Sequence, residues 1–289
     1  MRLLCFCIIL FFSSLLPAFA GERISDYAVN RIDEFMKFRV DISSCQSSEE
    51  SLRLIDEFER ETDSKLPAHS VDLEQERLIL ESLYIMERHH YLYDDVNMRP
   101  KLCDIMKLQM EKNERYISSL KGKSCANKWL YVLTGDVTSI YMTFSLSATL
   151  KYGFHVKDLY EKALKQDSRL SYALTNLGQW MFYAPKIFGG GKKKALKCFS
   201  SAVSSSRNEG EQFFSDIYMS QFYFDRKETE LAKQYLDKAI AYNQDSNYVM
   251  QVKLLNDNGW SLFYYNRHRA GVDKDIKESG FKEPVDDED

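Results

Sequence analysis

Small and bulky apolar residues recur in one fixed order in the C-terminal half of the chain. The order is a small or β-branched residue, a large apolar residue one helical turn later, and then an alanine. It occurs as Val156, Tyr160 and Ala163, as Ala195, Phe199 and Ala202, and as Ala232, Leu236 and Ala239. The alanines lie 39 and then 37 positions apart (163 to 202, then 202 to 239). This spacing predicts stacked helical hairpins, in which the alanines permit close packing and the bulky residues fill the space between layers.

The same pattern gives approximate boundaries for three hairpins. They pair residues 129–150 with 156–166, a helix through Tyr172 with 192–205, and 213–224 with 228–242. A further helix at 248–266 is expected to cover the open end of the array, because a repeat stack needs a cap at each end.

The N-terminal part also predicts helices, although it lacks the alanine pattern. Apolar periodicity favours helices at 22–40, from Ser47 or Ser48 onward, at 71–93 and at 99–120, with a turn at 62–70 around Pro67. We therefore predict an all-α fold: a helical-hairpin solenoid at 124–268 behind an N-terminal region at 21–123. That region is either a helical bundle or a set of divergent repeats. Residues 269–289 are acidic and have too little apolar content to fold.

The first twenty residues are typical of a secretory signal. Arg2 precedes an apolar run of about 14 residues, shorter than the roughly 20 that span a bilayer, and Ala18 and Ala20 supply a small-x-small cleavage pattern. We expect export to the periplasm or the exterior, a mature chain from Gly21 and no integral membrane segment after cleavage. Cys5 and Cys7 lie near the start of the run, which argues against a lipid anchor.

Composition narrows the class of protein further. The 18 Tyr and 18 Phe suit a large core, and the formal charge of −4 provides no basic surface for nucleic acid. Four cysteines remain after the signal, namely Cys45, Cys103, Cys125 and Cys198. They allow three complete disulfide pairings that the sequence does not separate. Cys198, next to Phe199, also suits the role of a small buried side chain.

The second hairpin resembles the tetratricopeptide repeat family. The resemblance rests on Leu174, Asn176 and Leu177-Gly178, followed by Ala195, Phe199 and Ala202, with Ala163 and Asp167-Ser168 matching the end of a preceding repeat. It covers roughly residues 124–243 and implies a binding scaffold, since many unrelated partners are bound by this fold. The spacing exceeds the family's usual length of about 34 residues, and the third repeat lacks the Leu-Gly pair.

A longer likeness involves the loop inside that hairpin. Its Tyr-Ala-Pro…Gly-Gly-Gly…Lys-Ala sequence is similar to that of periplasmic T-component proteins associated with TRAP transporters. The resemblance implies an auxiliary of solute uptake that binds a small ligand, a solute-binding protein or both. The loop residues of interest are Pro185, Gly189, Gly190, Gly191 and Lys192. The glycines and lysines could hold an anion at a helix N-terminus; alternatively, the glycines serve a reversal with positive φ and the lysines are solvated.

The first helices of successive hairpins line the concave surface of a solenoid, so their polar and aromatic residues are the candidate binding groove. These residues are Tyr172, Thr175, Asn176, Gln179 and Tyr183, with Tyr218 and Tyr223 from the next hairpin. Asn176 is equally suited to a structural hydrogen bond between helices. We predict a binding protein that has no catalysis and no cofactor, and self-association stays open. A general protein-interaction scaffold of the cell envelope is the alternative function.

The hypothesis of a metal-binding protein or an enzyme rests on one histidine pair. His90 and Asp94 stand at helical i, i+4 spacing beside His89, a possible two-ligand face. The competing interpretation is a surface histidine pair near a helix end, where the dipole favours cations. No third ligand is evident from the sequence, so this reading is a remote alternative and no metal is predicted.

Overall fold

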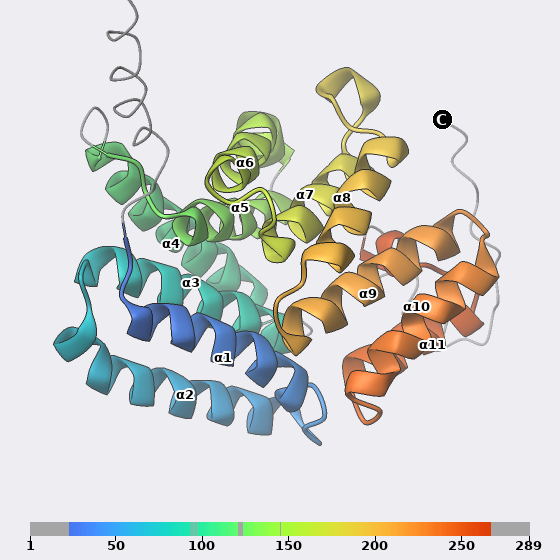
Figure 1. Ribbon diagram of the computed structural model, residues 1–289, viewed down its shortest axis with the longest axis horizontal. Coiled ribbons are helices and arrows are strands. Elements are labelled where there is room, and N and C mark those ends of the chain that lie inside the picture. The colour runs from blue at the N-terminus through green and yellow to red at the C-terminus, as the bar shows by residue number, and fades with distance from the viewer. Residues whose placement is uncertain (1–22, 94, 96, 121–123, 145, 267–289) are drawn as a thin grey trace, which may run out of the picture.

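The computed structural model describes residues 23–266, except for 94, 96, 121–123 and 145. The predicted signal segment, the acidic tail and Asp94 lie outside the described residues. Everywhere else the regular structure is helical, and no strand occurs among the described residues. The predicted all-α helical repeat fold is therefore confirmed (Figure 1).

The helices follow one another with short connections. In chain order they are α1 (Asp26–Ile42), α2 (Ser48–His69), α3 (Leu73–Leu92), α4 (Arg99–Ser119), α5 (Lys128–Thr143), α6 (Leu146–Gln166), α7 (Ser171–Tyr183), η1 (Lys186–Phe188), α8 (Lys192–Ser205), α9 (Glu209–Asp225), α10 (Thr229–Tyr242) and α11 (Asn247–Asp257). A short helical turn follows at residues 262–266.

The three predicted hairpins are α5 with α6, α7 with α8, and α9 with α10, and the helices of each pair pack side by side. Their spaced alanines are fully buried. Two glycines on the first helices make the packing especially close. A side-chain carbon at Gly135 or Gly178 would lie 2.6 Å from the ring of Tyr160 or Phe199, respectively. The aromatic residue of each second helix thus fills the space that a glycine leaves on the first, which is the physical basis of the repeat pattern.

The predicted boundary inside the first hairpin is wrong. The helix expected to run to Leu150 ends at Thr143, and α6 already begins at Leu146. Hydroxyl groups account for the early stop, because Thr143 Oγ1 donates to the Ile140 carbonyl and Thr149 Oγ1 donates to the Met142 carbonyl. Such local bonds satisfy the carbonyls that a continuing helix would use.

The predicted turn around Pro67 is also wrong, because α2 continues through it to His69. Pro67 lies in the last turn of the helix, where its missing N–H removes a single backbone hydrogen bond. The segment is held by its neighbours: Thr62 and Leu66 are fully buried, and the Ser70 N–H donates to the Leu66 carbonyl. Tertiary packing outweighs the local preference of proline here.

The expected capping helix is broken in two. α11 ends at Asp257, and Gly259 has a φ of 80°, with the Trp260 N–H bonding back to the Leu255 carbonyl. This is a Schellman-type helix end. The reversal drives Phe263 into the interior, where its ring stacks on that of Phe182 at 4.2 Å. The end of the array is therefore covered by α11 together with the helical turn at 262–266, whose Phe263 packs into the core.

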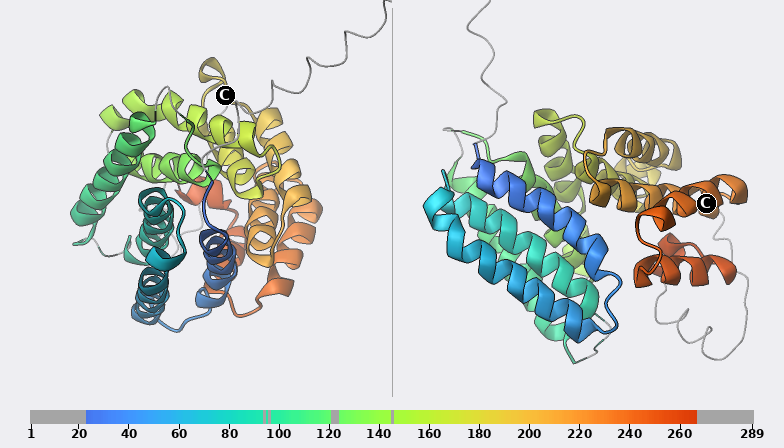
Figure 2. Two further views of the ribbon diagram at one scale, coloured as in Figure 1. Left: turned by 60° about the vertical axis from the view of Figure 1, so that its left-hand side comes forward. Right: turned by 60° about the horizontal axis from the view of Figure 1, so that its bottom comes forward.

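The N-terminal helices lie between the two ends of the array of hairpins, with α3 and α4 packed on α5 at one end and α1 packed on α9 at the other. Figure 2 shows α1 beside α9, and α3 packs on α5. A side-chain carbon at Gly210 would collide with the Met36 carbonyl oxygen, so only glycine allows α9 to approach α1 so closely. Past the end of α1, the Ser43 carbonyl accepts from the Asn247 N–H at 2.7 Å. One buried core runs through both halves of the chain.

Candidate functional site

A cavity of about 970 Å³ lies between the first helices of the hairpins and the N-terminal helices α1 and α3. α5, α7 and α9 provide one side, α1 and α3 the other, and α6 extends along the rim. Much of the lining is apolar, and comes from Met36, Met86, Ile140, Met142, Leu150, Phe154, Trp180 and Phe214. A concave, mostly apolar space with a few polar groups is the usual form of a small-molecule site.

The structure brings most of the predicted groove residues to this cavity. Six of the seven line it, namely Tyr172, Thr175, Asn176, Gln179, Tyr183 and Tyr218. Tyr223 is not among the lining residues, because its ring stacks on Tyr235 between α9 and α10 at 5.7 Å. Several of the six also have structural partners. The Tyr183 hydroxyl, for example, donates to the Phe263 carbonyl.

The glycine-rich loop borders the cavity only at its start. Pro185 lines the cavity, whereas Gly189, Gly190, Gly191 and Lys192 do not. Gly189 and Gly191 have φ values of 90° and 140°, so both need the left-handed region that glycine tolerates. Lys192 pairs with Asp225 at 3.3 Å. The loop geometry matches the reversal interpretation.

A buried carboxyl group organises the polar part of the cavity wall. Asp136, only 4% exposed, accepts a hydrogen bond from the Tyr160 hydroxyl at 2.8 Å and another from Asn176 Nδ2 at 3.0 Å. Gln179 Nε2 in turn donates to Asn176 Oδ1 at 3.0 Å. The bond from Asn176 on α7 to Asp136 on α5 is the structural hydrogen bond between helices that the sequence allowed for Asn176. The same network holds the amide of Gln179 at the cavity surface.

The electrostatic state of this carboxyl is unusual. Burial raises the pKa of Asp136 to about 7, even though hydrogen bonds from Tyr160 and Tyr172 and the charge of Arg39 lower it. The group therefore changes charge near neutral pH. Burial and the nearby Asp136 carboxylate also raise the pKa of Tyr172 well above its ordinary value. Tyr172 thus stays a neutral hydroxyl that can donate or accept a hydrogen bond.

Arg39 is the one arginine or lysine among the described lining residues. Its Nε donates to Glu87 Oε2, and its guanidinium carbon lies 4.2 Å from the centre of the Phe214 ring. Glu87 is buried but does not line the cavity. The ion pair therefore joins α1 to α3 at the wall of the cavity, which Arg39 lines.

Sequence reasoning missed Arg39 and Asp136. A signal for Asp136 existed, since it is the sole acidic residue in the otherwise apolar and hydroxylic stretch 129–150. The sequence gives a weaker signal for Arg39, because its helix is predicted to belong to a separate N-terminal region. Only the packing of α1 against α9 places it near Tyr172 and Tyr218.

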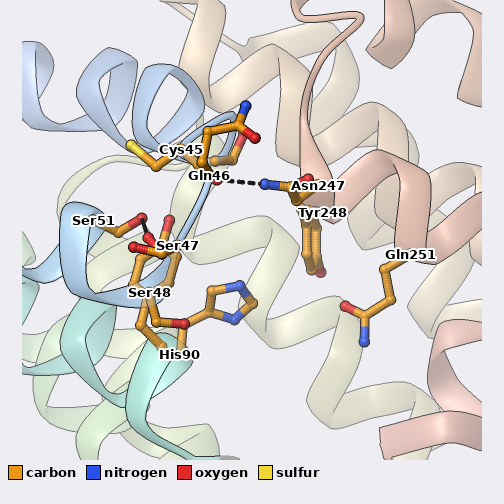
Figure 3. Close-up of a pocket in the computed structure, with 11 residues that line it drawn as sticks. Cys45, Gln46, Ser47, Ser48, Ser51, His90, Asn247, Tyr248 and Gln251 are labelled. Atoms are coloured by element: carbon orange, nitrogen blue, oxygen red, sulfur yellow. Dashed lines mark hydrogen bonds between the residues drawn. The ribbon is translucent and has the colours of Figure 1, made fainter.

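A second, polar pocket of about 370 Å³ lies between the α1–α2 connection, α3 and α11 (Figure 3). His90 borders it, and its ring meets that of Tyr248 edge-on at 5.5 Å. His89, by contrast, lines the large cavity. The two histidines of the predicted metal face therefore border different spaces. No group of three potential metal ligands occurs among the described residues, and Asp94 lies outside them.

Two further observations concern the predicted chemistry. Cys45, Cys103, Cys125 and Cys198 are all free thiols in this structure, and burial raises the pKa of Cys198 to about 11. None of the helices in the described part of the chain has the length and apolarity needed to cross a membrane.

The chain matches none of the known protein families, curated proteins or solved structures with which it was compared.

Proposed function

We propose that this protein is a non-catalytic binding protein whose central cavity holds a small amphipathic molecule. The observation that carries the proposal is the 970 Å³ cavity itself, lined by apolar side chains and by one polar cluster around Asp136 and Arg39. Its size suits a ligand with an apolar body, and the polar cluster provides orientation.

The position of the N-terminal helices favours a small ligand over a peptide. A peptide that binds a helical solenoid lies along the concave surface formed by the first helices of the hairpins. In this chain α3 packs on α5, α1 packs on α9, and Gly210 brings α9 against the backbone of Met36, so the N-terminal helices border that surface as well. A cavity with helices on both sides favours a compact ligand, so the general peptide scaffold is the weaker alternative.

The resemblance to T-component proteins gives the proposal its sharpest form. In that form the protein works in the periplasm beside a solute-binding protein and a permease, and its ligand is the transported solute or a related molecule. The signal-like residues 1–20 and the loop at 183–192 support this role.

Blocking the cavity tests the proposal. In thermal unfolding of the purified protein, 1-decanol serves as an uncharged amphipathic probe, and binding to the folded state raises the midpoint. Ile140→Trp places a large ring in the cavity wall and should abolish that rise. Leu108→Trp, at a position that is 55% exposed on α4 and outside the cavity, is the matched control and should retain it. An equal rise in both variants, or none in the wild type, would contradict cavity binding.

A further inference from the structure

Helix α1 carries two arginines that are similar in setting but different in their partners. Arg31 and Arg39 stand two helical turns apart, and each guanidinium stacks on an aromatic ring. The guanidinium carbon of Arg31 lies 3.8 Å from the centre of the Phe58 ring, and that of Arg39 lies 4.2 Å from the centre of the Phe214 ring. Each also pairs with a carboxylate, Arg31 with Glu34 and Arg39 with Glu87. Arg31 therefore serves as an internal reference for an arginine whose three nitrogens all have acceptors within the protein.

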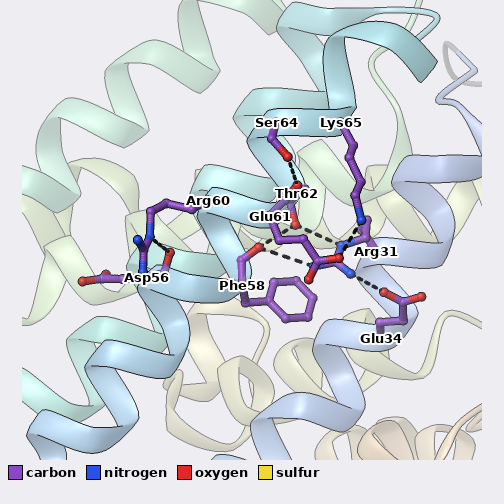
Figure 4. Close-up of polar contacts among 9 residues, drawn as sticks. All are labelled: Arg31, Glu34, Asp56, Phe58, Arg60, Glu61, Thr62, Ser64 and Lys65. Carbon is purple, nitrogen blue, oxygen red and sulfur yellow. Dashed lines mark hydrogen bonds and ion pairs between the residues drawn. The ribbon is translucent and has the colours of Figure 1, made fainter.

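All three nitrogens of Arg31 have oxygen acceptors (Figure 4). Nε donates to Thr62 Oγ1 at 2.9 Å, Nη1 donates to Glu34, and Nη2 donates to the Phe58 carbonyl at 3.4 Å. The bonds from Nε and Nη2 join α1 to α2. Arg31 is therefore a structural residue with its hydrogen-bonding capacity used within the protein.

Arg39 uses only one of its nitrogens in this way. Nε donates to Glu87, Nη1 has only the Met36 sulfur at 4.0 Å, and Nη2 has no hydrogen-bond acceptor among the described residues. A guanidinium has five N–H donors, so most of those on Arg39 are not used within the described part of the chain. The side chain is 20% exposed and borders the cavity, and none of its nitrogens is among the buried polar atoms that lack a partner, so these donors are accessible to a ligand there.

We propose that Arg39 anchors the head group of the ligand, and that the ligand is an amphipathic carboxylate with an apolar chain or ring system. This inference rests on the proposed function of the cavity. The two terminal nitrogens of a guanidinium match the two oxygens of a carboxylate in a bidentate pair. Tyr218 borders the same cavity, and its hydroxyl can donate to the same group, whereas Tyr172 already donates to Asp136. The apolar lining receives the rest of the molecule.

The other charged groups at the cavity are compatible with an anionic head below about pH 7. The titratable or charged residues that border the cavity are Arg39 from α1, His89 from α3, Tyr93 directly after α3, Asp136 from α5, Tyr160 from α6, Tyr172 and Tyr183 from α7, and Glu211 and Tyr218 from α9. Burial raises the pKa of both carboxyls, that of Asp136 to about 7. A protonated Asp136 donates a hydrogen bond and does not repel a carboxylate. A guanidinium pairs with phosphate as well as with carboxylate, but a phosphate head would bring up to two negative charges to a cavity whose described lining has one arginine and no lysine.

Three probes with the same ten-carbon chain separate the head groups. Calorimetric titration of the purified protein at pH 6 should give a dissociation constant for decanoate at least tenfold lower than that for 1-decanol, and decylammonium should bind more weakly than decanol. Equal affinity for decanoate and decanol, or tighter binding of decylammonium, would overturn the carboxylate assignment and leave the cavity function standing. Failure of every probe to bind would instead count against the proposed function itself.

Paired substitutions locate the effect at Arg39. Arg39→Gln with Glu87→Gln removes both charges together, so that no buried carboxylate is left alone, and should remove the preference for decanoate while decanol binding persists. Arg31→Gln with Glu34→Gln is the matched control on the same helix and should keep the full preference. A preference that survives the first pair would refute the role of Arg39. If that pair fails to fold, the wild-type ratio of decanoate to decanol affinity decides: it should fall severalfold from pH 6 to pH 8 as Asp136 ionises, and a ratio independent of pH would refute the arrangement.

Discussion

Replacing Asp136 with asparagine should make folding stability depend differently on pH. The carboxyl has an ordinary pKa of 3.8 and is raised to about 7 by burial in the folded protein. Between these values the folded state holds a proton that the unfolded state has lost. Linkage then requires that stability falls as pH rises through this window, and that the loss is complete above about pH 7. The amide of the Asp136→Asn variant cannot ionise, so the variant escapes the loss.

The size of the effect follows from the two pKa values. One pKa unit corresponds to about 1.4 kcal/mol, and part of the shift is already expressed at pH 5. Between pH 5 and pH 8 the wild type should therefore lose about 2 to 3 kcal/mol relative to Asp136→Asn. The side chain is only 4% exposed, so solvent screening reduces this figure little. Any constant cost of altered hydrogen bonds to Tyr160 or Asn176 cancels when the two pH values are compared.

Urea unfolding of both proteins at pH 5, 6, 7 and 8 measures this difference. Asp104→Asn, at an exposed position on α4, is the control for loss of one negative charge. A stability difference between wild type and Asp136→Asn that stays constant across these pH values would refute the reasoning. It would mean that Asp136 ionises in the folded protein as easily as in the unfolded chain, and that the cavity wall is better hydrated than its geometry indicates.

Three further outcomes are expected. Gly178→Ala should lower the free energy of unfolding by about 1 to 3 kcal/mol in urea titration, because the new methyl group meets the buried ring of Phe199 on α8. The control Gly153→Ala, with open space at that position, should be neutral or slightly stabilising. Gly210→Ala should cost about 3 kcal/mol or more, because the carbonyl of Met36 cannot move aside; wild-type stability would show that α1 does not close against α9. N-terminal sequencing of the exported protein should find a start near Gly21, and an uncleaved chain would contradict the secretory signal.

The candidate site could be predicted from the sequence on one side only. Six of the cavity residues come from the first helices of two neighbouring hairpins, and the repeat pattern already indicates that such helices share a face. Arg39 could not be assigned to the cavity in this way, because the periodicity of apolar residues does not indicate which N-terminal helix packs beside the first helices of the hairpins. Its ion pair with Glu87 and its ring contact with Phe214 join three separate helices. Asp136 was identifiable as an isolated acidic residue, but its raised pKa depends on the burial that these helices create.

The sequence by itself determined the helical class, the three hairpins and the shared face of their first helices. It did so because alanine spacing and apolar periodicity act over one or two turns, and each turn repeats the same packing problem. Tertiary structure decided that α2 continues through Pro67, and the structure also places helix breaks after Thr143 and at Gly259, where burial or a local hydrogen bond outweighs propensity. It also decided that the concave surface becomes a bounded cavity, because the approach of α1 to α9 depends on contacts between residues far apart in the chain.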